Sequence, residues 1–131
     1  MLAFLVDLEN KPGGLARVAE AIAAKGVNIE SISGAACGDA GRAAILTSDA
    51  ATTRKALGEI GSTFSEMEAT EVTLRHEAGT LAKVARRLGD AGVNIEALLP
   101  IGMEGHDVRV AIVTNDPVKA GELLSRAGIR R

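Results

Sequence analysis

The chain has 131 residues, a formal net charge of −2, 47% hydrophobic residues and only 2% aromatic residues. Residues 1–66 carry 6 basic and 8 acidic groups and residues 67–131 carry 9 of each, so neither half has the basic surface typical of a nucleic-acid binder. The shortage of aromatic rings also argues against a surface on which single-stranded bases stack.

The first half predicts a strand, a helix, two strands, a second helix and a further strand. Pro12 fixes its own φ, and Gly13 and Gly14 allow the chain to turn sharply from the first strand into the first helix. Asp49 is a typical N-cap residue for the second helix, and Gly61 is a typical helix end. The predicted elements are a strand at Leu2–Leu8, a helix at 15–23, a strand at Val27–Ser33, a small-residue loop at Gly34–Gly41, a strand at Arg42–Thr47, a helix at Ala50–Glu59 and a weaker strand at Phe64–Met67.

The second half repeats the first. Val6–Glu30 aligns with Val72–Glu96 at an offset of 66 without a gap, and 12 of the 25 aligned positions are identical. A repeat of this density indicates two copies of one structural unit. The second copy predicts strands at Glu71–Arg75, Asn94–Leu99 and Asp107–Thr114, helices at Thr80–Ala91 and Pro117–Ala127, and a loop through Gly102 and Gly105.

Each copy has the element order βαββαβ. This order predicts an α+β fold in which four antiparallel strands form one layer and two helices cover one of its faces. We place the domains at 1–67 and 68–131 and expect the last strand of the second domain to be truncated, because Arg130 is the counterpart of Phe64. Units of about 65 residues bury little surface alone, so we expect a pseudo-twofold pair. We also expect a homodimer, since an open sheet edge favours pairing.

The stretch Leu8-Glu9-Asn10-Lys11-Pro12-Gly13, followed by an amphipathic helix and by Gly26-Val27-Asn28-Ile29, resembles the ACT domain. The resemblance covers nearly the whole chain, twice. It implies a ferredoxin-like fold and a small regulatory module that binds an amino acid between two paired copies. The ligand would lie against the strand–helix turn of one copy and the start of the second strand of the other. The residues implicated are Asn10, Gly13 and Asn28 in the first copy and Gly79 and Asn94 in the second, where His76 and Ala78 depart from the pattern of Asn10 and Pro12.

The residues themselves give this turn a binding mechanism. A glycine turn that opens a helix leaves backbone N–H groups unpaired at the positive end of the helix dipole. Gly13, Gly14 and Leu15 would donate to a carboxylate, with the charge of Lys11 nearby, and Asn10 and Asn28 could hold the α-ammonium and the carboxylate together. Alternatively, Asn10 caps a turn and Asn28 merely follows a helix end. The candidate ligand-binding positions of the second copy are His76, Gly79, Thr80, Leu81 and Asn94.

Other chemistry has weaker support in the sequence. His76 and His106 are separate and lack the ligand spacing of a metal site, and Cys37 has no histidine placed near it. We therefore expect neither a metal, a cofactor nor catalysis. The lone cysteine excludes an intramolecular disulfide, and no apolar run approaches the roughly 18 residues of a membrane span, so we expect a cytoplasmic protein.

Three functions remain open at this stage. The first is an amino-acid sensor that works as a homodimer, with a regulated enzyme as its candidate partner. The second is a ligand-free interaction module, and the third is a small enzyme on a ferredoxin-like scaffold. The fold alone does not choose among them.

Overall fold

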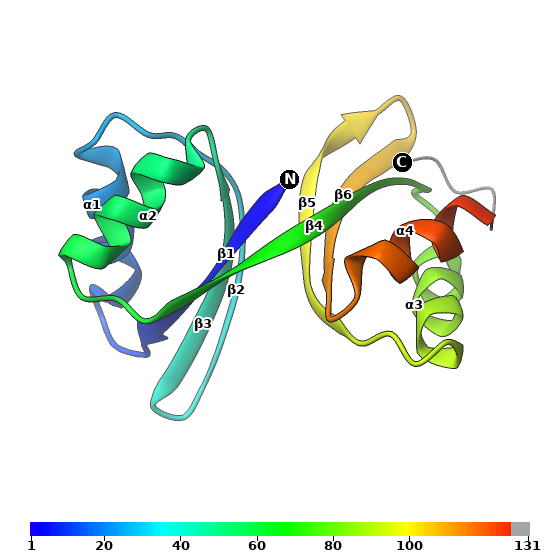
Figure 1. The fold of residues 1–131 in the computed structure, drawn as a ribbon, viewed down its shortest axis with the longest axis horizontal. Helices are drawn as coiled ribbons and strands as arrows, with labels where there is room; N and C mark the ends of the chain where they lie inside the picture. Colours follow the sequence, from blue (N-terminus) through cyan, green and yellow to red (C-terminus); the bar gives the residue numbers. More distant parts are fainter. Residues whose placement is uncertain (127–131) are drawn as a thin grey trace. The chain divides into compact units, whose positions relative to one another are not determined.

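The chain folds into two units of similar construction, and the computed structural model describes residues 1–126 (Figure 1). The first unit comprises Leu2–Met67, and the second begins at Glu68 and includes Met1. No helix in residues 1–126 is long and apolar enough to cross a membrane. The elements in chain order are β1 (Leu2–Glu9), α1 (Gly14–Ala23), β2 (Ile29–Cys37), β3 (Ala40–Thr47), α2 (Ala50–Glu59), β4 (Phe64–Arg75), α3 (Thr80–Asp90), β5 (Ile95–Glu104), β6 (Asp107–Thr114) and α4 (Pro117–Arg126).

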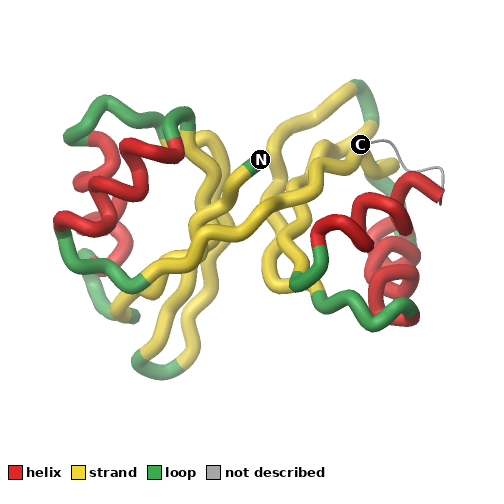
Figure 2. Tube along the Cα trace, viewed as in Figure 1, coloured by secondary structure: helices red, strands yellow, loops and turns green. Residues whose placement is uncertain are grey.

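In the first unit the strands lie in the order β2-β3-β1-β4, and α1 and α2 cover one face of the sheet (Figure 2). β3 runs antiparallel to both β1 and β2, so that Ile45 pairs with Phe4 on one side and with Ile32 on the other. Val18 and Ile22, one turn apart on α1, are buried against this face. The core between sheet and helices contains Phe4, Val6, Val18, Ile22, Ile45 and Leu57.

The second unit repeats this arrangement with the strand order β4-β6-β5. Val84 and Leu88 on α3 are the counterparts of Val18 and Ile22 at an offset of 66, and both are buried. Because burial of each such side chain contributes about 1.5–3 kcal/mol, the shared apolar stripe gives both units the same helix orientation. The core of this unit contains Val72, Val84, Leu88, Ile112, Ala120 and Leu124.

The antiparallel α+β architecture predicted from the sequence is confirmed, but several strand boundaries differ. The predicted loop at Gly34–Gly41 is mostly strand: β2 runs to Cys37, β3 begins at Ala40, and only a tight turn at Gly38 (φ 60°) separates them. Small side chains do not prevent ladder pairing, because the bonds are made by the backbone. β5 extends in the same way to Glu104, next to a turn at Gly105, whereas β6 has the predicted bounds Asp107–Thr114.

The strands predicted at Phe64–Met67 and Glu71–Arg75 are parts of one continuous strand, β4. The residues between them, Glu68–Thr70, contain no glycine or proline that would interrupt a strand. The helix predicted to end at Ala91 ends one residue earlier, at Asp90. The helix end predicted at Ala127 lies outside the described residues. The predicted truncated last strand, at residues 130 and 131, lies outside them as well.

Candidate functional site

The turn between β1 and α1 has a backbone that only glycine adopts easily. Gly13 lies at the N-cap of α1 with φ 88°, and its counterpart Gly79 lies at the N-cap of α3 with φ 92°. Gly14 is constrained by space instead, because a Cβ there would lie 2.1 Å from the backbone oxygen of Glu9. The second unit has Thr80 at this position, so its turn is necessarily more open.

Two of the three expected backbone donors at this turn are available to a ligand. The N–H of Gly14 donates to the carbonyl of Lys11 at 3.0 Å and is therefore already used. Within residues 1–126, the N–H groups of Gly13 and Leu15 have no acceptor. They lie at the positive end of the helix dipole and favour a carboxylate there.

Asn10 connects the turn to the β2–β3 hairpin. Its backbone N–H donates to the carbonyl of Asp39 at 3.4 Å, and its side-chain Nδ2 donates to the carbonyl of Gly38 at 2.6 Å. The alternative interpretation of Asn10 as a structural residue therefore has support. Its Oδ1 still offers lone pairs to a donor.

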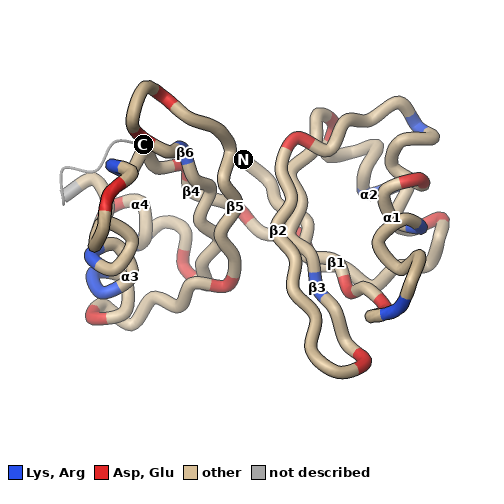
Figure 3. The backbone as a smooth tube through the Cα atoms, turned by 180° about the vertical axis from the view of Figure 1, so that it is seen from behind, with Lys and Arg blue, Asp and Glu red and all other residues tan. Residues whose placement is uncertain are grey.

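Charges of both signs surround the turn, as the coloured backbone in Figure 3 indicates. The Nζ of Lys11 lies 2.6 Å from the Oε2 of Glu9, and this hydrogen bond lowers the pKa of the Glu9 carboxyl. Arg42 Nε lies 3.5 Å from Asp7 Oδ1. Arg17 on α1 donates through Nη2 to the carbonyl of Ile60 at the end of α2. The positive charge expected from Lys11 is thus partly balanced by Glu9.

Two adjoining cavities share the turn residues. The first, which we call the turn cavity, has a volume of about 860 Å³ and is lined by the turn, the start of β3 and the chain after α2; its charged residues are Asp7, Glu9, Lys11, Arg17 and Asp39. The second, which we call the apolar groove, has a volume of about 410 Å³ and lies between the start of α1 and β2. Leu8, Glu9, Lys11 and Gly41 line both cavities. Polar and apolar surfaces therefore meet at this turn.

Asn28 lies at the other end of the first unit from Asn10. Its backbone N–H donates to Ser48 Oγ at 3.0 Å, and its carbonyl accepts from the N–H of Ser48 at 3.0 Å. Helix α1, which separates the two asparagines, has 10 residues and is about 15 Å long at 1.5 Å per residue. One ligand therefore cannot contact Asn10 and Asn28 of the same unit.

The second unit has the same framework with different side chains. The N–H of His76 donates to the carbonyl of His106 at 3.3 Å, which matches the bond between Asn10 and Asp39. Glu77 replaces the cation Lys11 with an anion. Leu81 is 50% exposed and its counterpart Leu15 is 49% exposed. Asn94 donates its backbone N–H to Asn115 Oδ1 at 2.9 Å, as Asn28 does to Ser48.

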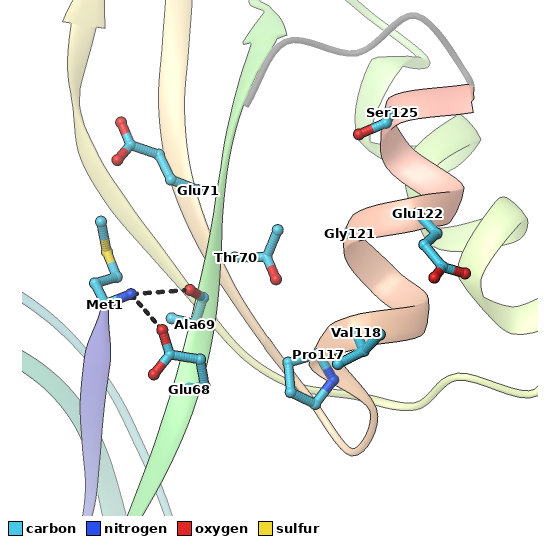
Figure 4. Close-up of a pocket in the computed structure, with 10 residues that line it drawn as sticks. All are labelled: Met1, Glu68, Ala69, Thr70, Glu71, Pro117, Val118, Gly121, Glu122 and Ser125. Atoms are coloured by element: carbon cyan, nitrogen blue, oxygen red, sulfur yellow. Dashed lines mark hydrogen bonds and ion pairs between the residues drawn. The ribbon is translucent and has the colours of Figure 1, made fainter.

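A third cavity, of about 880 Å³, lies in the second unit between β4 and α4 (Figure 4). Thr70 points towards α4, whereas Glu71 lies on the opposite side of β4 and pairs with Arg109. None of the residues that the sequence implicates in binding lines this cavity.

Nothing in residues 1–126 forms a group of three or more histidine, cysteine or acidic side chains able to hold a metal ion. Cys37 is exposed.

Three contacts of the site were missed by sequence reasoning: the hairpin tip at Gly38, the brace from Arg17 to Ile60, and the polar side chain before each second helix. The sequence contains a signal for the third contact, the polar side chain before each second helix. Ser48-Asp49 and Asn115-Asp116 match at an offset of 67, one residue more than the offset of the first helices. In both units this side chain accepts the N–H of the asparagine that precedes the second strand.

Comparisons with known proteins find an ACT domain in the first unit and several solved structures with a similar fold. Residues 3–48 match the family model of the ACT domain. A search of curated proteins gave no match. The crystal structure of protein BT0572 from Bacteroides thetaiotaomicron is similar with a TM-score of 0.80 and 26% identity, over 98% of this chain and 89% of that chain.

Two regulatory subunits of aspartate kinase have the same fold at lower identity. The one from Thermus thermophilus, in its ligand-free form, has a TM-score of 0.66 and 19% identity over 96% of this chain and 90% of that chain. The one from Thermus flavus has a TM-score of 0.67 and 23% identity over 96% and 88%.

Proposed function

We propose that the chain, whose residues 3–48 match the ACT-domain family model, is a regulatory protein that binds a free α-amino acid at the β1–α1 turn of its first unit. One observation carries the proposal: Glu9, Lys11, Gly13 and Asp39 line one cavity of about 860 Å³, and the N–H of Gly13 has no acceptor within residues 1–126. A free amino acid is a zwitterion and needs partners of both signs. Small-molecule sites have volumes of about 300–1,000 Å³.

The proposed contacts follow from the charged residues that line the turn cavity. The carboxylate of the ligand accepts from the N–H groups of Gly13 and Leu15 and lies near Lys11. The α-ammonium faces the acidic side of the cavity, where Glu9 and Asp39 stand. In this proposal the chain catalyses no reaction; binding changes how it associates with a partner, and a regulated enzyme is the partner class we propose.

The proposed role of Asn28 needs a second unit. Because Asn28 lies at the far end of its own unit, it would contact a ligand held by the turn of another unit. We propose that a homodimer supplies such pairings. Within residues 1–126, β2 pairs only with β3 and β5 pairs only with β6, and open edges favour pairing. Sedimentation at tens of micromolar, a rough concentration for a specific interface, should show a dimer, and a monomer would contradict this part of the proposal.

The second unit should bind more weakly. Glu77 stands where Lys11 stands, so a carboxylate would meet a negative charge. At an exposed site this difference is about 1 kcal/mol or less, which is a preference and not an exclusion. Isothermal titration calorimetry should therefore resolve a tighter and a weaker site per chain, and two equal sites would count against the assignment.

A thermal-shift screen against the twenty amino acids, followed by calorimetry, tests the proposal. A ligand at 100 times its Kd stabilises the folded state by about 2.7 kcal/mol, which is easily seen. Lys11→Glu should weaken binding severalfold, whereas Glu77→Lys, its matched control, should leave the tight site unchanged. If no amino acid stabilises the protein, the proposed function is wrong.

A further inference from the structure

We propose that the amino acid bound by the first unit has an apolar side chain, and that the apolar groove holds it. This inference rests on the proposed function and names the ligand class. The groove adjoins the turn cavity through Leu8, Glu9, Lys11 and Gly41, which line both. A ligand whose charged head lies at the turn therefore has the groove within reach of its side chain.

The groove lies on the helix-covered face of the sheet. Ile32 pairs with Ile45, and Gly34 pairs with Ala43. Directly opposite residues of an antiparallel pair point to the same face, and Ile45 and Ala43 belong to the core beneath the helices. Ile32 and Gly34 therefore point to the helix side, where α1 leaves them uncovered.

Small residues make the groove deep enough for a side chain. Gly34, Ala36, Gly41 and Ala43 form its floor, and Leu15 and Ile32 line it while remaining 49% and 43% exposed. Two half-exposed aliphatic side chains facing one hollow leave apolar surface that a third apolar group can cover. The charged residues that line the groove, Glu9, Lys11 and Arg42, are already paired in the Glu9–Lys11 and Asp7–Arg42 ion pairs. A charged ligand side chain would therefore gain little there for the hydration it loses.

The second unit carries larger residues at most of these positions. Its pairing register places Pro100 opposite Val110, as Gly34 lies opposite Ala43. Val108 pairs with Leu74, as Gly41 pairs with Leu8. The floor of small residues in the apolar groove is therefore specific to the first unit and is not a requirement of the fold.

Residues at the entrance of the groove can bind the α-ammonium and the α-carboxylate of an amino acid. Asn10 lines it, and because Nδ2 is held by Gly38, the Oδ1 of Asn10 is the atom that can accept from an α-ammonium. The N–H of Leu15 lies at the start of α1, beside the same groove, and can donate to the α-carboxylate. The charged groups on the α-carbon of the ligand and its apolar side chain therefore contact separate, adjacent surfaces of the protein.

The first test compares amino acids by calorimetry. Leucine, isoleucine, valine, methionine and phenylalanine should bind at least about tenfold more tightly than glycine, aspartate, lysine and serine, since burying a side chain of this size is worth that factor or more. If a polar amino acid binds best, the ligand class is wrong while the proposed function stands. If none of the twenty binds, the proposed function itself fails.

The second test fills the groove. A Cβ at Gly34 would meet Ala43 Cβ at 3.6 Å, an ordinary contact, so Gly34→Leu should fold normally and place its side chain in the groove. We expect it to weaken leucine binding at least about tenfold, with a melting temperature close to that of the parent. Gly102→Leu on β5, where nothing lies within 4 Å of an added Cβ, is the matched control and should bind leucine normally.

The third test removes a wall of the groove and does not depend on how the first variant folds. Leu15→Ala should weaken leucine binding severalfold and glycine binding little. Leu81→Ala removes the equally exposed counterpart in the second unit and should change neither affinity at the tight site. Equal losses for leucine and glycine with Leu15→Ala, or unchanged leucine affinity with Gly34→Leu, would overturn the inference.

Discussion

Replacing Gly14 by alanine tests whether the close approach of α1 to β1 shapes the site. A Cβ at this position would lie 2.1 Å from the Glu9 carbonyl oxygen, whereas real Cβ contacts essentially never fall under 3.0 Å. The turn must therefore open by at least the difference, 0.9 Å. Backbone cannot swing aside as a flexible side chain does, so the start of the helix has to move.

The cost of this movement has two parts. The bond from the N–H of Gly14 to the carbonyl of Lys11, 3.0 Å long, is weakened or lost, which costs about 0.5–1.5 kcal/mol. Strain from an overpacked contact costs about 1–3 kcal/mol. Alanine regains up to about 1 kcal/mol because it restricts the unfolded chain. We expect a net loss of about 1–3 kcal/mol in the free energy of unfolding, measured by urea denaturation.

The matched control is Gly58→Ala in α2, where no heavy atom lies within 4 Å of the added Cβ. This change should stabilise the protein by about 0.5–1 kcal/mol, the difference in helix propensity. Affinity for the amino acid identified in the screen should fall in Gly14→Ala, because the donors of Gly13 and Leu15 move, and should stay constant in Gly58→Ala. Parental stability in Gly14→Ala would refute the reasoning.

Three further predictions follow from single contacts. Asn28→Ala keeps both backbone bonds to the start of α2, so we expect a stability change below about 0.5 kcal/mol and a ten- to hundredfold loss of affinity. Asn94→Ala is its control with a smaller loss, and a lower melting temperature with unchanged calorimetric affinity in Asn28→Ala would contradict the site. Asn10→Ala removes the 2.6 Å bond to the hairpin and should cost about 0.5–1.5 kcal/mol, seen as faster amide exchange in the hairpin. The hydrogen bond from Arg54 lowers the pKa of Glu66 from 4.5, so this pair stabilises the fold above pH 4.5 and loses its effect as the pH falls through the lowered pKa. Glu66→Gln should therefore be less stable than the parent by about 1 kcal/mol or less at pH 7, and this difference should shrink steadily as the pH falls below 4.5. A difference that does not change with pH would exclude an ionic origin.

The sequence by itself determined the local structure of both units. Helical spacing of Val18 and Ile22, repeated by Val84 and Leu88, placed α1 and α3, because the position of a side chain around a helix depends only on its place in the chain. The left-handed turns at Gly13 and Gly79 were also readable, since glycine is the residue that adopts such a φ without strain. The repeat then extended each local inference to the second copy.

Only the tertiary structure decided which of the predicted residues meet. Helix α1 carries the chain back along the sheet from the end of β1 to the start of β2. Asn10 and Asn28 therefore lie at opposite ends of one unit, although the sequence separates them by only 18 positions. The hairpin that holds Asn10, at Gly38 and Asp39, lies 28 and 29 positions away. The groove forms where Leu15 of α1 meets residues of the three strands β1, β2 and β3. Such contacts depend on strand pairing and on the space between packed layers, which the order of residues along the chain does not specify by local rules.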